Sequence, residues 1–307
     1  MTGVVSVRPA CPEDAAAVVG VVHAGFGARP LLDPPATAPD ETADSVRAAL
    51  EQHGGLLAVV RDRPVGAMLF EPAGRLLGLR RVAVHPSAQG VGVAGALVAE
   101  AEKVAGARAY DGLSLTARAE LPSTVRFWRH QGYVEVGRDG VFLTMAKLLP
   151  VVLLSTTGDQ TRQVGERLAR LLRAGDLVIL NGDLGSGKTT LTQGIGDGLG
   201  VRGPVTSPTF VISRVHPPLA DGPALVHVDA YRLGGIEELD DLDLDASLDE
   251  AVTVVEWGED VAEGLADDRL EVSIHRAHAD EPSENRTLSL QAVGSRWLGA
   301  GLREALA

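Results

Sequence analysis

The residues best suited to chemistry lie in an apolar run, Leu177 to Leu180, and in the glycine-rich turn that follows it. That turn, Gly182 to Thr189, fits G-x-x-x-x-G-K-[ST] at every fixed position. Its glycines let backbone N–H groups face phosphates, and the helix after it adds its positive end. We expect Lys188 to neutralise phosphate charge and the Thr189 hydroxyl to bind Mg2+. The candidate nucleotide ligands here are Gly182, Asp183, Gly185, Ser186, Gly187, Lys188, Thr189 and Thr190.

Two later strands each carry an acid at their end. The apolar run Ala224 to Asp229 ends in Asp229, and the run Val252 to Trp257 has Glu256 in its last positions. Because the carboxyl ends of parallel strands meet at one edge of a sheet, both acids should lie beside the phosphate turn. One acid can hold Mg2+, and the other can orient or activate an attacking water. A structural carboxylate at a strand end is the alternative for each.

Other segments of the second half should surround this edge. The run Thr161 to Leu172 has the spacing of an amphipathic helix, which Gly175 should end. The hydroxyl-rich segment Val205 to Phe210 is either a nucleotide-sensitive switch or a static turn. Segment Glu237 to Glu250 has eight acids and no base, and it favours a solvated helical face over a calcium loop. Two antiparallel strands, at Leu270 to His275 and Thr287 to Val293, should close the sheet. A final helix should follow them at Trp297 to Leu306.

A second candidate anion site lies in the first half. The strand Leu76 to Val84 leads into Gln89-Gly90-Val91-Gly92-Val93-Ala94, which opens a helix. Free N–H groups at a helix start relieved by glycine suit a pyrophosphate. This short motif could equally be an ordinary helix start. The segment Arg29 to Asp44 holds four prolines and predicts a loop, which either covers plain surface or lines a substrate site.

The elements around this turn can be placed from their periodicity. A strand at Val4 to Arg8 and a helix from Pro12 toward Val22 precede the loop. A hairpin is expected from Leu56 to Val60 and Pro64 to Phe70. Another strand should follow at Leu113 to Ala117, and another helix at Ser123 to His130.

This order of elements resembles the GNAT family of N-acetyltransferases over about residues 4 to 148, and Phe127 to Tyr133 resembles a C-terminal element of that family. The resemblance implies a mixed sheet with helices on both faces. Trp128 departs from the family pattern, because a tyrosine that serves as general acid is common there. Glu71 and Glu120 are possible bases, and a noncatalytic coenzyme A-binding module is the alternative. The resemblance assigns acetyl-CoA contacts to Val82, Val84, Gln89, Gly90, Val91, Gly92, Val93 and Ala94.

The second half resembles the TsaE family, also called YjeE, over about residues 151 to 293. Four motifs carry the resemblance in order: Gly182 to Thr190, Ser207 to Phe210, His227 to Arg232, and Glu256 with Trp257. It implies a P-loop NTPase-like sheet flanked by helices. It also implies an ATPase that acts with TsaD and TsaB in threonylcarbamoyladenosine modification of tRNA, which those partners hold.

The family pattern assigns roles to individual residues of this sequence. It implies that Thr189 and Glu256 are Mg2+ ligands and that Lys188 and Asp229 are catalytic residues. Two further positions fall near nucleotide contacts of the family, Gly158 and Arg286.

A small-molecule kinase is the alternative for the second half, since a phosphate loop does not say whether water or a hydroxyl attacks. A kinase lid would be rich in arginine, but between Val201 and Arg232 only Arg202, Arg214 and Arg232 occur. Recognition of GTP by N-K-x-D is excluded, because no lysine follows Lys188.

Length and charge favour two domains, a GNAT-like domain at residues 1–149 and a TsaE-like domain at residues 150–307. The first 150 residues contain 15 Lys and Arg and 15 Asp and Glu, so the net charge of −13 lies in the remainder. Such an acidic half is a poor partner for nucleic acid by itself. Cys11 is the single cysteine, which excludes an internal disulfide. Since neither a signal sequence nor a membrane-spanning run is evident, we expect a cytoplasmic protein.

Overall fold

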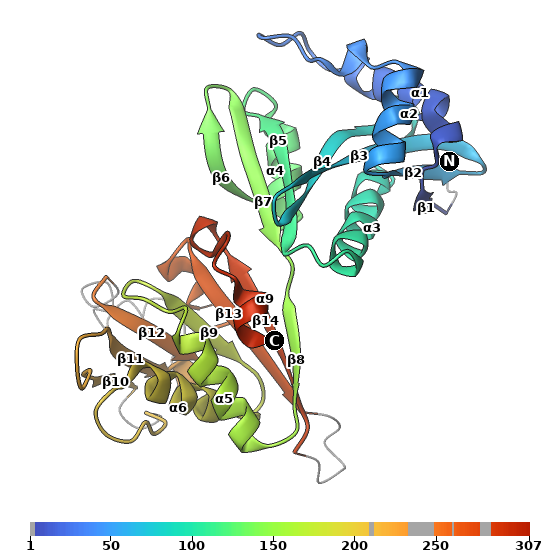
Figure 1. Ribbon diagram of the computed structural model, residues 1–307. Helices are drawn as coiled ribbons and strands as arrows, with labels where there is room; N and C mark the ends of the chain where they lie inside the picture. Colours follow the sequence, from blue (N-terminus) through green and yellow to red (C-terminus); the bar gives the residue numbers. More distant parts are fainter. Residues whose placement is uncertain (1–3, 209–211, 233–248, 260, 277–283) are drawn as a thin grey trace. The chain divides into compact units, whose positions relative to one another are not determined.

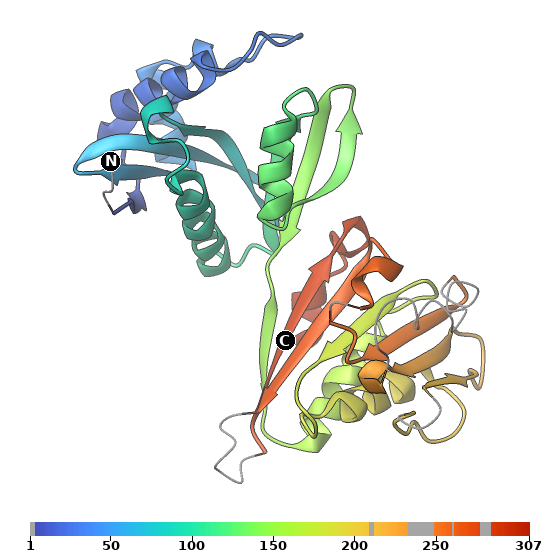
Figure 2. The same cartoon turned by 180° about the vertical axis from the view of Figure 1, so that it is seen from behind.

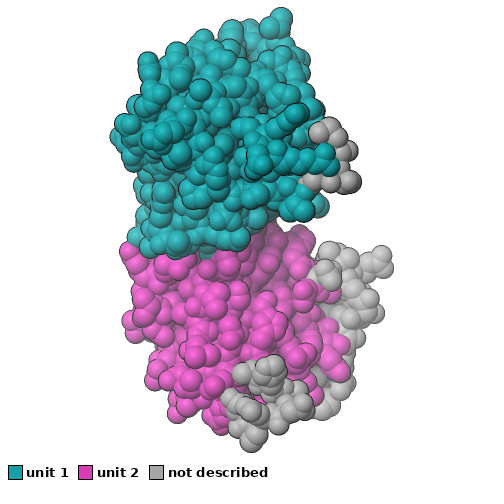
Figure 3. Space-filling view, turned by 90° about the vertical axis from the view of Figure 1, so that its right-hand side faces the viewer, with its two compact units in different colours: residues 1–149 teal, residues 150–307 magenta. Residues whose placement is uncertain are grey.

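The computed structural model describes residues 4–208, 212–232, 249–259, 261–276 and 284–307. The chain divides into two compact units, Met1–Leu149 and Pro150–Ala307 (Figure 3). Thr209 and Phe210 of the predicted switch segment, and residues 237–248 of the acidic segment, lie outside the described residues. No helix in the described ranges is long and apolar enough to cross a membrane.

The first unit is built on a seven-stranded sheet with the order β1-β2-β3-β4-β5-β7-β6 (Figure 1). Neighbouring strands are antiparallel except β4 and β5, which run parallel and pair only from Leu76 with Gly112 to Leu79 with Leu115. Beyond that point the two strands are no longer paired. The strands are β1 (Ser6–Pro9), β2 (Gly55–Val60), β3 (Arg63–Ala73), β4 (Leu76–Val84), β5 (Gly112–Arg118), β6 (Val134–Asp139) and β7 (Phe142–Leu148).

Helices cover both faces of this sheet, as the GNAT resemblance implies. In β2, Leu57 packs into a cluster with α1 (Ala15–Gly27) and α2 (Ala43–Gln52). Its neighbours Leu56 and Ala58 pack on the other face, in the cluster that holds α3 (Val93–Ala107) and α4 (Pro122–His130), as strand alternation requires. Figure 2 shows the helices of this unit from behind. Short 3-10 turns occur at η1 (Pro12–Asp14), η2 (Ala38–Asp40) and η3 (Pro86–Ala88).

The second unit has a seven-stranded sheet with the order β10-β11-β12-β9-β13-β14-β8. Its four central strands, β11, β12, β9 and β13, are parallel. The outer pairs β10–β11, β13–β14 and β14–β8 are antiparallel. The strands are β8 (Val151–Ser155), β9 (Leu177–Asn181), β10 (Ser213–His216), β11 (Ala224–Asp229), β12 (Ala251–Glu256), β13 (Arg269–Arg276) and β14 (Arg286–Val293).

Two helices of the second unit, α5 (Gly158–Ala169) and α6 (Lys188–Leu199), pack closely against each other. Glycines allow this approach, because a Cβ on Gly194 would lie 2.0 Å from the Arg162 carbonyl oxygen. On another part of the sheet, Ile179 and Val255 pack with Ala262, next to η5 (Glu263–Leu265). The remaining short elements are η4 (Ala230–Arg232), η6 (Ser295–Trp297) and α9 (Leu302–Leu306).

Several predictions about elements are wrong. The helix expected from Thr161 ends at Ala169, so Gly175 does not end it. The predicted loop before Asp44 contains η2 and the first residues of α2, and the Thr42 hydroxyl accepts a hydrogen bond from the Ser45 N–H there.

One prediction for the last third of the chain is confirmed and one is wrong. Strands β13 and β14 are antiparallel to each other, as predicted, and β13 also pairs in parallel with β9, which the sequence analysis did not foresee. The expected helix from Trp297 is interrupted, because Gly299 and Gly301 adopt positive φ angles of 74° and 70°. Within the predicted range, Trp297 ends the 3-10 turn η6, and the α-helix is confined to Leu302–Leu306.

Candidate functional site

The glycine-rich turn joins β9 directly to α6, as its motif predicts. Gly182, Gly185 and Gly187 have φ angles of 140°, 74° and 112°, a region that favours glycine. A Cβ on Gly182 would also lie 2.3 Å from the Ile274 carbonyl oxygen. The turn therefore requires glycine for both its conformation and its packing.

Lys188 is nearly buried at the start of α6. Its Nζ donates to the carbonyl oxygens of Gly182 and Asp183, at 2.6 and 3.1 Å, and lies 3.6 Å from the centre of the Trp257 ring. Burial lowers the pKa of Lys188, and the nearby carboxylates of Glu256 and Asp229 oppose that shift. The ammonium is thus held inside the turn by weak neutral acceptors and an aromatic face.

Glu256 ends β12 beside the turn, in register with Leu180 of β9 and Asp229 of β11. Its Oε2 accepts from the Thr189 hydroxyl at 3.2 Å, and its Oε1 lies 2.9 Å from Nε2 of His227. Both Glu256 and His227 are buried. The prediction that the two strand-end acids lie at the edge with the phosphate turn is confirmed.

Asp229 is also buried, and its two oxygens have separate donors. Oδ2 accepts from the Ser207 hydroxyl and Oδ1 from the Tyr231 N–H, each at 3.1 Å. Ser207 belongs to the predicted switch segment, so the structure links that segment to the acid. This contact joins two of the sequence motifs at one carboxylate.

His227 and Trp257 belong to two of the motifs that resemble the TsaE family, but the sequence analysis gave neither residue a contact or a role of its own. Because strand side chains alternate, His227 shares a face with Asp229, two residues later, and that spacing could have indicated its place. Trp257 has a φ of 62°, which is unusual for a residue other than glycine, and its ring also lies 5.0 Å from that of Tyr231. No sequence signal predicts this conformation.

The residues present fit a nucleotide with Mg2+. The Ser186 hydroxyl oxygen is buried and has no hydrogen-bond partner within the described ranges, and it lies in the turn that should hold phosphates. Thr189 and Glu256 offer oxygen ligands, which Mg2+ prefers, and it commonly takes only one or two protein ligands beside phosphates.

The two other predicted nucleotide residues differ in their contacts. Arg286 begins β14, and its Nε donates to the Ser186 carbonyl oxygen at 2.8 Å, so it braces the turn. Gly158 begins α5, one turn before Thr161. The Thr161 methyl group would lie 3.9 Å from a Cβ on Gly187.

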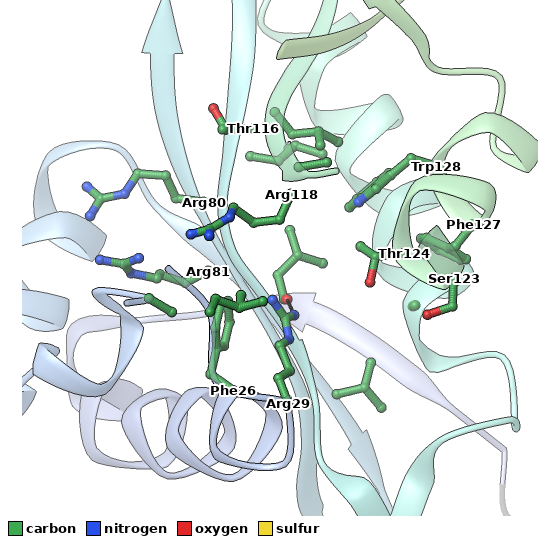
Figure 4. Close-up of a pocket in the computed structure, with 18 of the residues that line it drawn as sticks. Phe26, Arg29, Arg80, Arg81, Thr116, Arg118, Ser123, Thr124, Phe127 and Trp128 are labelled. Carbon is green, nitrogen blue, oxygen red and sulfur yellow. Dashed lines mark hydrogen bonds between the residues drawn. The ribbon is translucent and has the colours of Figure 1, made fainter. Parts of the chain in front are cut away.

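The first unit has a pocket of about 890 Å3 where β4 and β5 separate (Figure 4). Five predicted coenzyme residues line it: Val82, Val84, Gln89, Gly90 and Ala94. Trp128 lines it as well and is nearly buried.

Three predicted coenzyme residues lie outside the lining. Val91 is half exposed, Val93 is buried in the core, and Gly92 precedes α3 with a φ of 85°. The two acids considered as bases, Glu71 and Glu120, also lie outside the lining and pair with Arg80 and Arg118.

Residues 155–287 match the family "Threonylcarbamoyl adenosine biosynthesis protein TsaE". The chain is 63% identical over 140 residues to the tRNA threonylcarbamoyladenosine biosynthesis protein TsaE of Streptomyces coelicolor, which covers 45% of this chain and 95% of that protein. The chain belongs to the TsaE family. The protein of the same name from Mycobacterium tuberculosis is 50% identical over 130 residues, and this match covers 40% of this chain and 77% of the Mycobacterium tuberculosis protein.

The part before this TsaE region matches a different family. Residues 28–133 match the acetyltransferase (GNAT) family, and the first unit is GNAT-like. An N-acetyltransferase from Thermoplasma acidophilum, solved in complex with coenzyme A, is 15% identical in sequence, with a TM-score of 0.43. The match covers 47% of this chain and 99% of that structure's chain. For the TsaE region, the Bacillus subtilis YdiB structure is 31% identical, with coverage of 51% and 93% and a TM-score of 0.40.

Proposed function

We propose that the second unit is a P-loop ATPase that supports threonylcarbamoyladenosine modification of tRNA together with TsaD and TsaB. The observation that carries the proposal is the meeting of Lys188, Thr189, Glu256 and Asp229 at one edge of a parallel sheet. Family membership supplies the pathway, since the relatives bear the name of that biosynthesis.

Each residue of the edge has a distinct part in hydrolysis. Lys188 exchanges the carbonyl oxygens of Gly182 and Asp183 for phosphate oxygens, which are stronger partners because they carry charge. Thr189 and Glu256 hold Mg2+, which neutralises charge on the phosphates. Asp229 orients the attacking water.

The Ser207 hydroxyl ties Asp229 to the switch segment in the structure described here. A change in that segment when nucleotide binds would free Oδ2 of Asp229 for water. The segment could in this way couple binding to hydrolysis. The acidity of this half of the chain fits a unit that docks on protein partners while those partners hold the tRNA.

The test is ATP hydrolysis by the full chain, alone and with TsaD, TsaB and tRNA. Lys188→Ala should lower turnover by about 100-fold or more while the protein stays folded. Lys103→Ala is the matched control, since Lys103 lies on the surface of the other unit and pairs with Glu100. Undiminished hydrolysis by Lys188→Ala would contradict the ATPase assignment. Turnover indifferent to the partners would contradict the role in tRNA modification.

For the first unit we propose binding of acetyl-CoA in the pocket between β4 and β5, with transfer of its acetyl group to an amine. Gly92 supports this, because its positive φ lets the backbone turn into α3 beside the pocket, and the space around it is open. Gly92→Ala should strain that turn by about 1–2 kcal/mol and weaken coenzyme A binding about tenfold. Gly95→Ala, inside α3 and equally open, is the control. Equal affinities for coenzyme A would contradict the proposed contact.

A further inference from the structure

The pocket of the first unit has a one-sided charge. Four arginines line it, Arg29, Arg80, Arg81 and Arg118, and none of the described residues in its lining is Asp or Glu. The first 150 residues as a whole are neutral, so this excess is local. A guanidinium group can bind a ligand here only if the protein's own carboxylates do not already pair with it.

Arg118 is used by the protein itself. Its Nη1 and Nη2 donate to the backbone oxygens of Pro34 and Asp33, at 2.8 and 2.9 Å, and its Nε donates to Glu120 at 2.9 Å. These contacts fasten the loop after α1 to the end of β5. Arg118 is therefore a structural cation at the pocket wall.

Arg80 and Arg81 share a buried carboxylate, Glu41. Nε of Arg81 lies 2.7 Å from an oxygen of Glu41, and Nη2 of Arg80 lies 3.3 Å from the same atom. Arg80 also pairs with Glu71 at 3.2 Å, and Arg81 donates to the Thr37 hydroxyl at 3.1 Å. The charges of both arginines are thus compensated within the fold.

Arg29 differs from these three. It lies over the Phe26 ring at 3.7 Å, and Nη2 donates to the Val82 carbonyl oxygen at 3.5 Å, but no carboxylate in the described part of the chain pairs with it. Arg29 is partly buried, and burial lowers its pKa. In Figure 4 its side chain rises into the pocket on the side opposite Thr124 and Trp128. A partly buried guanidinium without an anion is costly, and a carboxylate is its best complement.

We propose that the acceptor in this pocket is a small amine that carries a carboxylate, and that Arg29 binds this carboxylate. The inference rests on the proposed acetyl-CoA site. The pocket volume of about 890 Å3 lies within the range of small-molecule sites and suits a coenzyme arm together with a small acceptor.

The position of Arg29 separates it from the phosphates of the coenzyme. Arg29 contacts the backbone of Val82, which lies roughly 7 Å along β4 before its last residue, Val84. The glycine turn begins farther on, after η3, so Arg29 and the glycine turn contact different parts of the chain. All phosphates of coenzyme A lie on the nucleotide side of its thiol arm. A coenzyme with its pyrophosphate at the glycine turn therefore brings the thioester, and not a phosphate, toward Arg29.

The reaction balances without a further reactant. The amine nitrogen attacks the thioester carbonyl carbon, a C–N bond forms, the C–S bond breaks, and the sulfur leaves as the thiolate of coenzyme A. The proton that the amine loses passes through water to that thiolate. The neutral amine is the reacting form, because the nitrogen of an ammonium group has no lone pair with which to attack.

The first measurement is coenzyme A affinity of the full chain by calorimetry. Wild type, Arg29→Gln and Arg108→Gln should bind alike. Arg108 is a matched control, because it also lies over a phenylalanine, Phe70, and donates to a backbone oxygen, that of His53, outside the pocket. A tenfold loss of coenzyme A affinity in Arg29→Gln but not in Arg108→Gln would show that the Arg29 guanidinium binds the coenzyme. That result would overturn the inference about the acceptor and leave the acetyl-CoA site standing. Failure of the wild type to bind coenzyme A would overturn the acetyl-CoA site itself.

The second measurement is acetyl transfer to the standard amino acids, β-alanine and their carboxamides, followed by mass spectrometry. Carboxamides lose the ammonium proton more easily, so unspecific transfer would favour them. We expect kcat/KM at least about tenfold higher for the carboxylate member of the reactive pair. Arg29→Gln should erase this preference by raising KM about 10- to 100-fold with little change in kcat, while Arg108→Gln keeps it. Equal rates within each pair, a preference that survives Arg29→Gln, or no transfer by protein that binds coenzyme A would each overturn the inference.

Discussion

Replacement of His227 by phenylalanine should raise the Mg2+ concentration that ATP hydrolysis requires by about 10- to 100-fold. In the structure His227 Nε2 lies 2.9 Å from Oε1 of Glu256, and the histidine side chain is fully buried. With Nε2 protonated, His227 donates to one carboxylate oxygen while Thr189 donates to the other. His227 is thus a positioning residue that fixes the plane of the carboxylate.

The size of the effect follows from the lost contact. A hydrogen bond to a charged group contributes about 1.5–3 kcal/mol, and each 1.4 kcal/mol is a factor of about ten in affinity. Phenylalanine keeps the ring volume but donates nothing. Glutamine places an amide N–H near the position of Nε2, so His227→Gln should retain most of the Mg2+ affinity.

The assay is the Mg2+ dependence of hydrolysis, together with Mn2+ binding measured by electron paramagnetic resonance in the presence of an ATP analogue. The second readout does not depend on turnover. Wild-type metal affinity in His227→Phe would refute the positioning role. Equal losses in the Phe and Gln variants, with unchanged thermal unfolding, would show that shape rather than the donated hydrogen bond matters.

Two further predictions concern stability. Arg296→Met leaves Asp176 buried without its bidentate partner and should destabilise the second unit by about 3–5 kcal/mol in chemical denaturation, whereas Arg162→Met removes an exposed pair and should cost less than about 1 kcal/mol. Asp14→Asn should destabilise the first unit by about 1 kcal/mol at pH 7, because the Arg8 guanidinium lowers the pKa of Asp14. Because the folded pKa of Asp14 is lowered, its contribution to stability is fully present above the unfolded pKa. The difference in thermal unfolding between variant and wild type should therefore begin to shrink as the pH falls below about 4, and it should close as the pH falls through the lowered pKa.

The parts of the site that could be predicted are those that the local sequence determines. The phosphate turn needs only its glycines, the strand before it and the helix after it. Strand β9 contains the predicted apolar run, and α6 begins at Lys188, within the motif. The edge of acids followed from two apolar runs with acids at their ends, since parallel strands bring such positions together. Whether each predicted ligand contacts nucleotide or coenzyme stays a prediction.

Features that depend on distant residues could not be predicted. The direction of β13 is set by its pairing with β9, almost a hundred residues earlier, and its alternating pattern is the same in either direction. The helix α2 lies directly after a proline-rich segment, and the prolines favoured a loop over the whole range, so the helix-capping hydroxyl of Thr42 was not recognised as the start of a helix. The left-handed backbone of Trp257 has no signature in its residue type.

The charge of the first unit shows why composition alone did not indicate an anionic acceptor. Equal numbers of acids and bases suggest a neutral domain, but a ligand meets only the groups that line its pocket. Glu41 pairs with both Arg80 and Arg81, Glu71 pairs with Arg80, and both acids lie outside the lining. Arg29 remains the guanidinium that the fold supplies with an aromatic face and a carbonyl oxygen but with no carboxylate among the described residues. The binding preference therefore depends on how the loop after α1 meets β4, which is a property of the folded chain and not of its residue counts.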